Sequence, residues 1–135
     1  MRVIYSVEEF KASLMVGDKF WTISTFFGKP TEIEGPMTIV RYDETERDVG
    51  NEKRIYEMVS CALKLLFDRD FTYDWYVADL VNSMHGVTLS KEDAKLYFKE
   101  RLRAFNADPE AQRRHVIEVE DFERQLRTLF SKFYM

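Results

Sequence analysis

The sequence predicts an α+β fold: a small N-terminal antiparallel β element, a hairpin or three-stranded meander, packed on a C-terminal bundle of about four helices. Residues 19–42 are rich in β-branched and aromatic side chains and are interrupted by glycine and proline. Beyond residue 52, apolar residues recur mainly at helical spacing. We therefore expect a single compact domain over 1–135, with a helix and a small sheet in 1–52 and helices in 53–135.

The first part of the chain predicts one helix and two or three strands. Ser6 and Glu9 form a capping box, which starts a short helix over about 7–14. Gly17 closes that helix. Strands are expected over 19–27 and 37–42, with 31–34 as a short strand between them and residues 2–5 as a further addition. The acidic segment 43–52 is expected to be a solvated loop.

The second part predicts helices. Six apolar residues follow the i, i+3, i+4, i+7 rule and predict a helix over 55–66: Ile55, Met58, Val59, Ala62, Leu63 and Leu66. A second helix is expected over about 77–84, and Ser90 caps a third. Pro109 starts another helical turn, and 115–119 is expected to be a strand or a connector. The last helix, about 120–134, is expected to bury Phe122, Leu126, Leu129, Phe130 and Phe133.

Composition excludes several classes of protein. The net charge is −4, from 20 basic and 24 acidic residues, so the chain lacks the strong positive charge of a dedicated nucleic-acid binder and is not acidic enough to imitate DNA. A single cysteine, Cys61, excludes an internal disulfide framework and a zinc site with paired thiolates. No apolar run approaches the ~20 residues of a membrane span, and no signal-peptide core is present. We therefore expect a cytoplasmic protein with no membrane contact.

Catalytic motifs are absent from the sequence. The five glycines are far apart, so there is neither a dinucleotide fingerprint nor a phosphate-binding loop. We expect no enzymatic activity, no cofactor and no metal, with Cys61 as a small core residue. An enzyme whose site is assembled from distant residues such as His85 and His115 stays open as an alternative.

Surplus aromatic residues are the main functional signal. Several lie next to predicted turns, and exposed Trp and Tyr side chains dominate the binding energy of protein interfaces. We therefore predict a small non-enzymatic regulator or inhibitor that binds a protein partner stoichiometrically. The residues expected to contact the partner are Phe26, Phe27, Phe71, Tyr73, Trp75 and Tyr76. The alternative is that these rings fill the core and cap the sheet.

Residues 76–105 support a second hypothesis, a helix-turn-helix regulator that binds DNA or RNA. A helix that ends near Gly86, a turn at 87–89 and a helix at 91–105 give the outline. The candidate contacts to phosphates form a basic stripe with two following arginines: Lys91, Lys95, Lys99, Arg103, Arg113 and Arg114. Glu92 and Glu100 on the same helix weigh against it, and solvated lysines that serve solubility are the alternative.

Two weaker signals concern partners. The amphipathic last helix, with Leu126, Phe130 and Phe133, could join two copies in a homodimer. In general organisation, with a short capped helix, the Val16-Gly17-Asp18-Lys19 entry to a strand and a helical tail, the chain resembles many small proteins of phages and mobile elements. That resemblance rests on no specific family, and it implies a regulator or inhibitor directed at a host protein.

Overall fold

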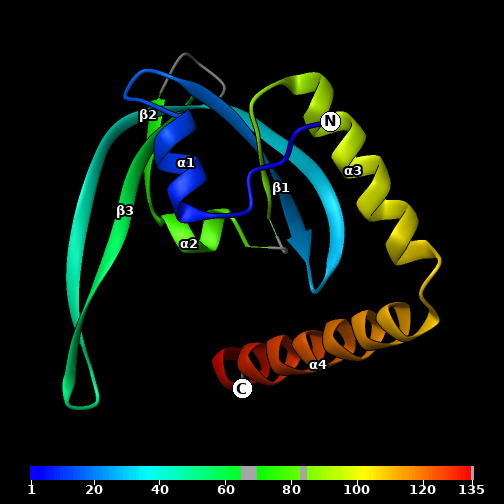
Figure 1. Cartoon of the computed structure of the whole chain (residues 1–135). Helices are drawn as coiled ribbons and strands as arrows, with labels where there is room; N and C mark the ends of the chain where they lie inside the picture. The colour runs from blue at the N-terminus through cyan, green and yellow to red at the C-terminus, as the bar shows by residue number, and fades with distance from the viewer. Residues whose placement is uncertain (65–69, 83–84, 135) are drawn as a thin grey trace.

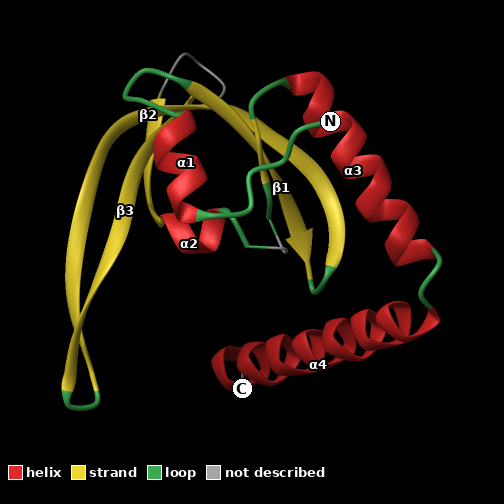
Figure 2. Cartoon of the chain, viewed as in Figure 1, coloured by secondary structure: helices red, strands yellow, loops and turns green. Residues whose placement is uncertain are grey.

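The computed structural model describes residues 1–64, 70–82 and 85–134, and it confirms the α+β class (Figures 1 and 2). In chain order the elements are α1 (Val7–Ser13), β1 (Lys19–Phe26), β2 (Lys29–Val49), β3 (Glu52–Lys64), β4 (Asp70–Tyr76), α2 (Val77–Leu80), β5 (Val87–Thr88), α3 (Lys91–Asn106) and α4 (Pro109–Tyr134). The strands form one antiparallel sheet in the order β4-β3-β2-β1-β5.

The main core lies between the sheet and the two short helices. Figure 1 shows α1 and α2 under the arch of β2, with α3 along the β1 side. Phe10 of α1 is fully buried and meets Phe20 of β1 edge-on, with ring centroids 5.5 Å apart. A second, smaller cluster of Val3, Ile23 and Tyr97 joins α3 to β1. Helices therefore cover the β1–β5 side of the sheet more fully than the far end of β2 and β3.

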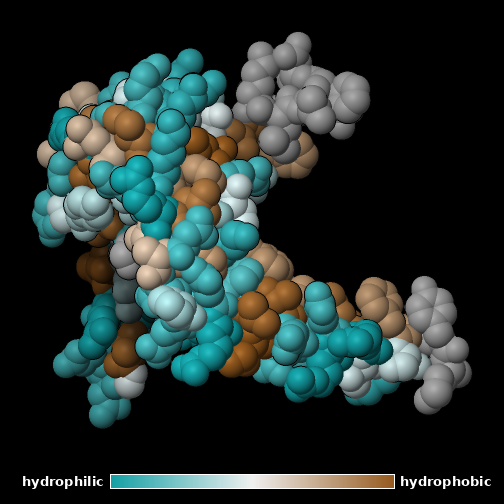
Figure 3. All heavy atoms as spheres, turned by 90° about the vertical axis from the view of Figure 1, so that its right-hand side faces the viewer, coloured by the Kyte–Doolittle hydropathy of each residue, from teal (hydrophilic) through white to brown (hydrophobic). Residues whose placement is uncertain are grey.

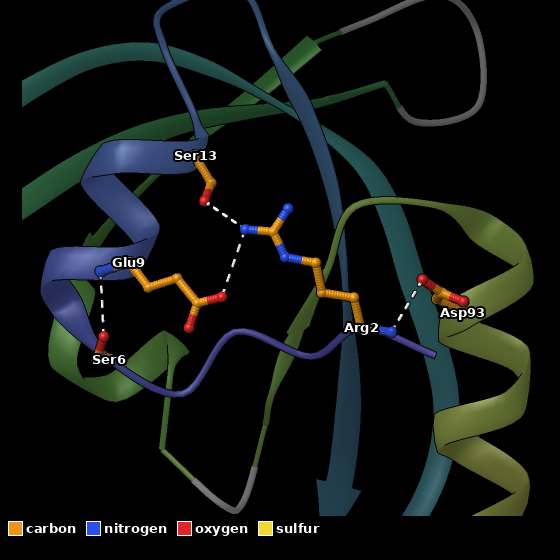
Figure 4. A network of polar contacts seen from close by, with 5 residues as sticks. All are labelled: Arg2, Ser6, Glu9, Ser13 and Asp93. Carbon is orange, nitrogen blue, oxygen red and sulfur yellow. Dashed lines mark hydrogen bonds and ion pairs between the residues drawn. The ribbon is translucent and has the colours of Figure 1, made fainter.

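The N-terminal segment connects α1 to α3 through polar contacts (Figure 4). The hydroxyl of Ser6 accepts a hydrogen bond from the Glu9 backbone N–H at 3.1 Å, which confirms the predicted cap. The Arg2 guanidinium donates to Ser13 Oγ at 2.8 Å and lies 3.4 Å from the Glu9 carboxylate. The backbone N–H of Arg2 donates to Asp93 on α3 at 3.2 Å. One residue therefore contacts both helices.

The helix predicted over 55–66 is wrong, because residues 52–64 form β3; residues 65 and 66 lie outside the described ranges. The segment fits both periods, since Val59 and Leu63 of the helical pattern also alternate with Cys61 along one face of a strand. Val59 and Cys61 are fully buried in that face. β3 pairs with β2 on one side and β4 on the other, so tertiary pairing overrides the helical pattern.

The loop predicted over 43–52 is also wrong. β2 is a single strand that runs through Gly35–Pro36 and on to Val49, and it pairs with β3 as far as Glu52. Gly50, at φ +66°, and Asn51 make the two-residue turn. Charged residues are tolerated because this ribbon extends past the rest of the sheet and is largely exposed to solvent (Figure 1).

The helices do not form the predicted bundle. α2 has only four residues, and α4 is continuous from Pro109 through the segment 115–119 that was expected to be a strand or connector. The expected turn at 87–89 contains β5, which pairs with Trp21 and Thr22 of β1. The helix-turn-helix outline is therefore not formed, although residues 83 and 84 lie outside the described ranges. Within those ranges, no helix is both long enough and apolar enough to cross a membrane.

Cys61 provides a direct test of this core. Burial, with a smaller contribution from the Asp74 carboxylate, raises the pKa of its thiol to about 12. Only the thiolate is a nucleophile, so we expect Cys61 at about pH 8 to react with an aromatic disulfide reagent roughly a thousandfold more slowly in the folded protein than in guanidinium chloride. Absorbance of the released thiolate measures both rates. Rapid labelling of the folded chain would contradict the burial of Cys61.

Candidate protein-interaction surface

Aromatic rings of the turn between β1 and β2 pack against α4. Phe27 and Gly28 both have positive φ, at +46° and +83°, as a two-residue hairpin turn requires. A bulky residue is strained in that region of backbone space. The Phe27 ring lies 4.7 Å from Phe26 and 5.5 Å from Phe122 of α4, centroid to centroid. The strained turn is therefore held by packing against the helix.

His115 attaches α4 to the same turn. Its Nδ1 lies 3.0 Å from the Phe27 carbonyl oxygen. A carbonyl oxygen only accepts, so Nδ1 carries the hydrogen and donates it. The imidazole also meets Phe105 of α3 nearly perpendicularly, with ring centroids 5.6 Å apart. The His115 side chain therefore joins α4 to both α3 and the β1–β2 turn.

Beyond this attachment, the last part of α4 projects from the body. We call residues 123–134 the α4 arm. Side-chain hydrogen bonds from Arg124, Thr128 and Ser131 all close within α4 itself. Figure 3 shows the helix at lower right, with a hollow between it and the rest of the molecule and apolar side chains along it.

A largely apolar stripe runs along α4 and continues into the arm. Its members follow one another at intervals of four and three residues: His115, Val119, Phe122, Leu126, Leu129 and Phe133. This is the spacing of a seam that packs along one side of a helix. The first part of the stripe contacts the β1–β2 turn, whereas Leu129 and Phe133 are 50% and 76% exposed. The prediction that the last helix buries Phe122, Leu126, Leu129, Phe130 and Phe133 is therefore wrong, because Leu126 is half-buried and the other four are at least 38% exposed.

The predicted partner-binding aromatics do not form one site. Phe26 and Phe27 pack against α4, as described above. Phe71 and Tyr73 are exposed on β4. Trp75 is half-buried and its ring lies 5.8 Å from that of His85. Tyr76 is half-buried between Tyr56, at 5.7 Å, and the Arg47 guanidinium, at 5.2 Å. Of the six predicted residues, some therefore pack within the molecule, and others are exposed to solvent on β4.

The predicted basic stripe lies on the exposed face of α3, opposite the buried Ala94 and Tyr97. Its members are Lys91, Lys95, Lys99 and Arg103, and none of them forms an ion pair within residues 1–64, 70–82 and 85–134. Arg113 is exposed on α4, and Arg114 lies 3.7 Å from Glu110. The six residues are thus accessible, and four of them form a row along α3.

An open cavity of about 580 Å³ lies where β2 begins, between α3 and α4. Its lining is largely apolar, from Phe26, Pro30, Phe98 and Leu102, and it includes His115. No carboxylate or cysteine is among the described residues that line it, so His115 has no acid or thiol beside it there. Across the described part of the chain, no three His, Cys, Asp or Glu side chains cluster closely enough to hold a metal ion.

Comparisons of the chain with models of protein families, with curated proteins and with solved structures found no match.

Proposed function

We propose that this protein is a non-enzymatic, cytoplasmic regulator or inhibitor that binds another protein stoichiometrically through the α4 arm. The observation that carries the proposal is the apolar stripe, which continues past its contact with the β1–β2 turn into Leu129 and Phe133. In proteins, most helix stability comes from packing an apolar face. A helix laid into a groove of a partner would supply that packing.

Charge on the arm specifies the partner's chemistry. Residues 123–134 contain three cations, Arg124, Arg127 and Lys132, against one carboxylate, Glu123. Arg124 lies 3.0 Å from Asp121, so the charge offered to a partner comes mainly from Arg127 and Lys132. An apolar groove with an acidic rim is complementary to this surface. Two arms of the same charge would repel each other, so the charge argues against the homodimer through the last helix that the sequence suggested.

The test is capture from host lysate, after nuclease treatment, on the immobilised full chain and two variants. Leu129→Glu places a carboxylate on the stripe, and Thr128→Glu places the same charge next to it on the exposed surface. We expect one stoichiometric protein to be retained by the wild type and by Thr128→Glu, and lost with Leu129→Glu. Circular dichroism checks that both variants fold. Retention by all three proteins would contradict the proposal.

A second candidate function, nucleic-acid binding, is favoured by the row of exposed cations on α3. Such a row could contact successive phosphates without the helix-turn-helix outline. Glu92 and Glu100 lie on the same helix and reduce its field. Binding of this kind would be electrostatic and independent of base sequence.

Exchanging Lys95 and Lys99 for Glu tests this candidate. If α3 binds phosphates, the double variant should lose retention on a DNA column, because two cations become two carboxylates in the middle of the row. The matched control exchanges Lys29 and Lys53, which are exposed outside α3, for Glu. Elution of the wild type and the α3 variant at the same salt concentration would exclude α3 as a nucleic-acid surface.

A further inference from the structure

The outer edge of β4 is an open sheet edge. β4 is the terminal strand of the sheet and pairs with β3 over seven consecutive residues without a bulge. Within the described ranges, no backbone hydrogen bond outside the ladder with β3 involves residues 70–75, and Tyr76 is the N-cap of α2. Natural proteins usually protect such an edge with a lysine, a proline, a bulge or a covering segment. β4 has no lysine, proline or bulge.

The two faces of β4 differ in chemistry. Phe71, Tyr73 and Trp75 pair with Leu63, Cys61 and Val59, so they share the apolar face of the sheet. Phe71 and Tyr73 are nevertheless 49% and 39% exposed, because the sheet ends beside them. Thr72 and Asp74 are exposed on the other face, where the Ser60 hydroxyl donates to Asp74 at 2.5 Å. An added strand would thus meet aromatic rings on one face and polar groups on the other.

We propose that this edge binds a second copy of the chain, with the two β4 strands antiparallel about a twofold axis at Tyr73. The sequence around Tyr73 is self-complementary in this register. Phe71 of one copy lies opposite Trp75 of the other, which makes an aromatic cross-strand pair on the apolar face. Thr72 lies opposite Asp74 of the second copy, where its hydroxyl can donate to the carboxylate.

Charge and side-chain alternation select this register. A shift by one residue would place the aromatic face of one strand opposite the polar face of the other. A shift of the axis to Asp74 places two copies of Asp74 opposite each other. A shift of the axis to Thr72 places Asp70 opposite Asp74. Like charges directly opposite are destabilising, so the register centred on Tyr73 is the one that matches both faces over most of the strand.

A contact between two seven-residue strands is small. Interfaces below ~1,200 Å² of total buried surface are typical of transient complexes. We therefore expect the association to depend on protein concentration, with monomer at low micromolar concentration and dimer accumulating at hundreds of micromolar. This pairing uses residues of β4 and none of the α4 arm, so it does not rest on the proposed function.

Disulfide trapping tests the register. Directly opposite residues in antiparallel strands have Cα atoms about 4.5–5.5 Å apart, within disulfide range. The test uses the full chain with Cys61→Ala, because Cys61 lies opposite Tyr73 in the same chain and could form an intramolecular disulfide. On this background, Tyr73→Cys should form a covalent dimer under mild oxidation. Phe71→Cys is the matched control, because its two copies would lie four residues apart along the strand, about 13 Å.

Equilibrium sedimentation supplies a second test. Tyr73→Lys puts two like charges together at the axis and should keep the chain monomeric throughout the concentration range. Thr72→Lys puts each new cation opposite Asp74 of the other copy and should lower the dimer dissociation constant severalfold. Circular dichroism checks the fold of both variants. Wild-type protein that stays monomeric at about 500 µM would overturn the proposal. So would cross-linking that is equal for Tyr73→Cys and Phe71→Cys. A dimer that is insensitive to Tyr73→Lys would do the same.

Discussion

Replacing Phe20 with alanine should lower the free energy of unfolding by about 3–5 kcal/mol. Phe20 is fully buried, lies opposite Met37 of β2 and packs its ring against Phe10. Its removal leaves a cavity that cannot close easily, because β1 is held between β2 and β5. Urea denaturation would measure the loss as a lower midpoint at unchanged slope.

Phe133→Ala is the matched control for this prediction, since it deletes the same atoms from a ring that is 76% exposed. We expect its free energy of unfolding to stay within about 0.5 kcal/mol of the wild-type value. Equal losses from the two substitutions would place Phe133 in the core and contradict the exposure of the arm.

Local signals explain why the first elements of the fold were predictable. Ser6 begins α1 because its hydroxyl satisfies a free N–H at the helix end, which depends on four consecutive residues only. The aromatic and β-branched run in β1 is equally local. Both predictions are confirmed to within about a residue or two at their ends, which is the usual uncertainty of helix and strand boundaries.

β3 could not be recognised by the same means, because its identity depends on its neighbours. Ile55, Met58, Val59 and Ala62 fit a helical stripe, and the alternation of Val59 and Cys61 fits a strand. Pairing with β2 decides between them, and β2 extended past residue 43 only because Gly50 and Asn51 permit a tight turn there. The Gly-Asn pair between Val49 and Glu52 was the one available signal for this hairpin, and the surrounding acidic residues obscured it.

The residues of the candidate surface on α4 could be identified from the sequence, but their exposure could not. The stripe from Phe122 to Phe133 is visible in the sequence, but periodicity does not distinguish a face that packs on its own chain from one that is free. The structure places the β1–β2 turn against the stripe only as far as Phe122. Likewise, aromatic content indicated Phe71, Tyr73 and Trp75 as candidate contacts, but not the strand β4 that carries them or its place at the edge, since both depend on pairing with β3.

Phe133→Ala should weaken binding of the captured partner at least ~30-fold, equivalent to about 2 kcal/mol, without changing the melting temperature. Buried aromatic anchors dominate interface energies because they lose their contact with water only on binding. Phe133 is the most exposed large apolar side chain of the described residues, at 76%, so binding can bury a large part of its ring. Isothermal titration calorimetry with the purified partner measures the change in affinity.

Thr128→Ala is the control on the same arm, because Thr128 is exposed and its hydroxyl bonds only to the Arg124 carbonyl oxygen. We expect it to change the affinity less than about threefold, since most interface residues contribute little when truncated. Phe20→Ala should then lower stability, whereas Phe133→Ala should lower the affinity for the partner and leave stability unchanged. An affinity that Phe133→Ala leaves unchanged would exclude the α4 arm from the interface and favour the basic stripe on α3.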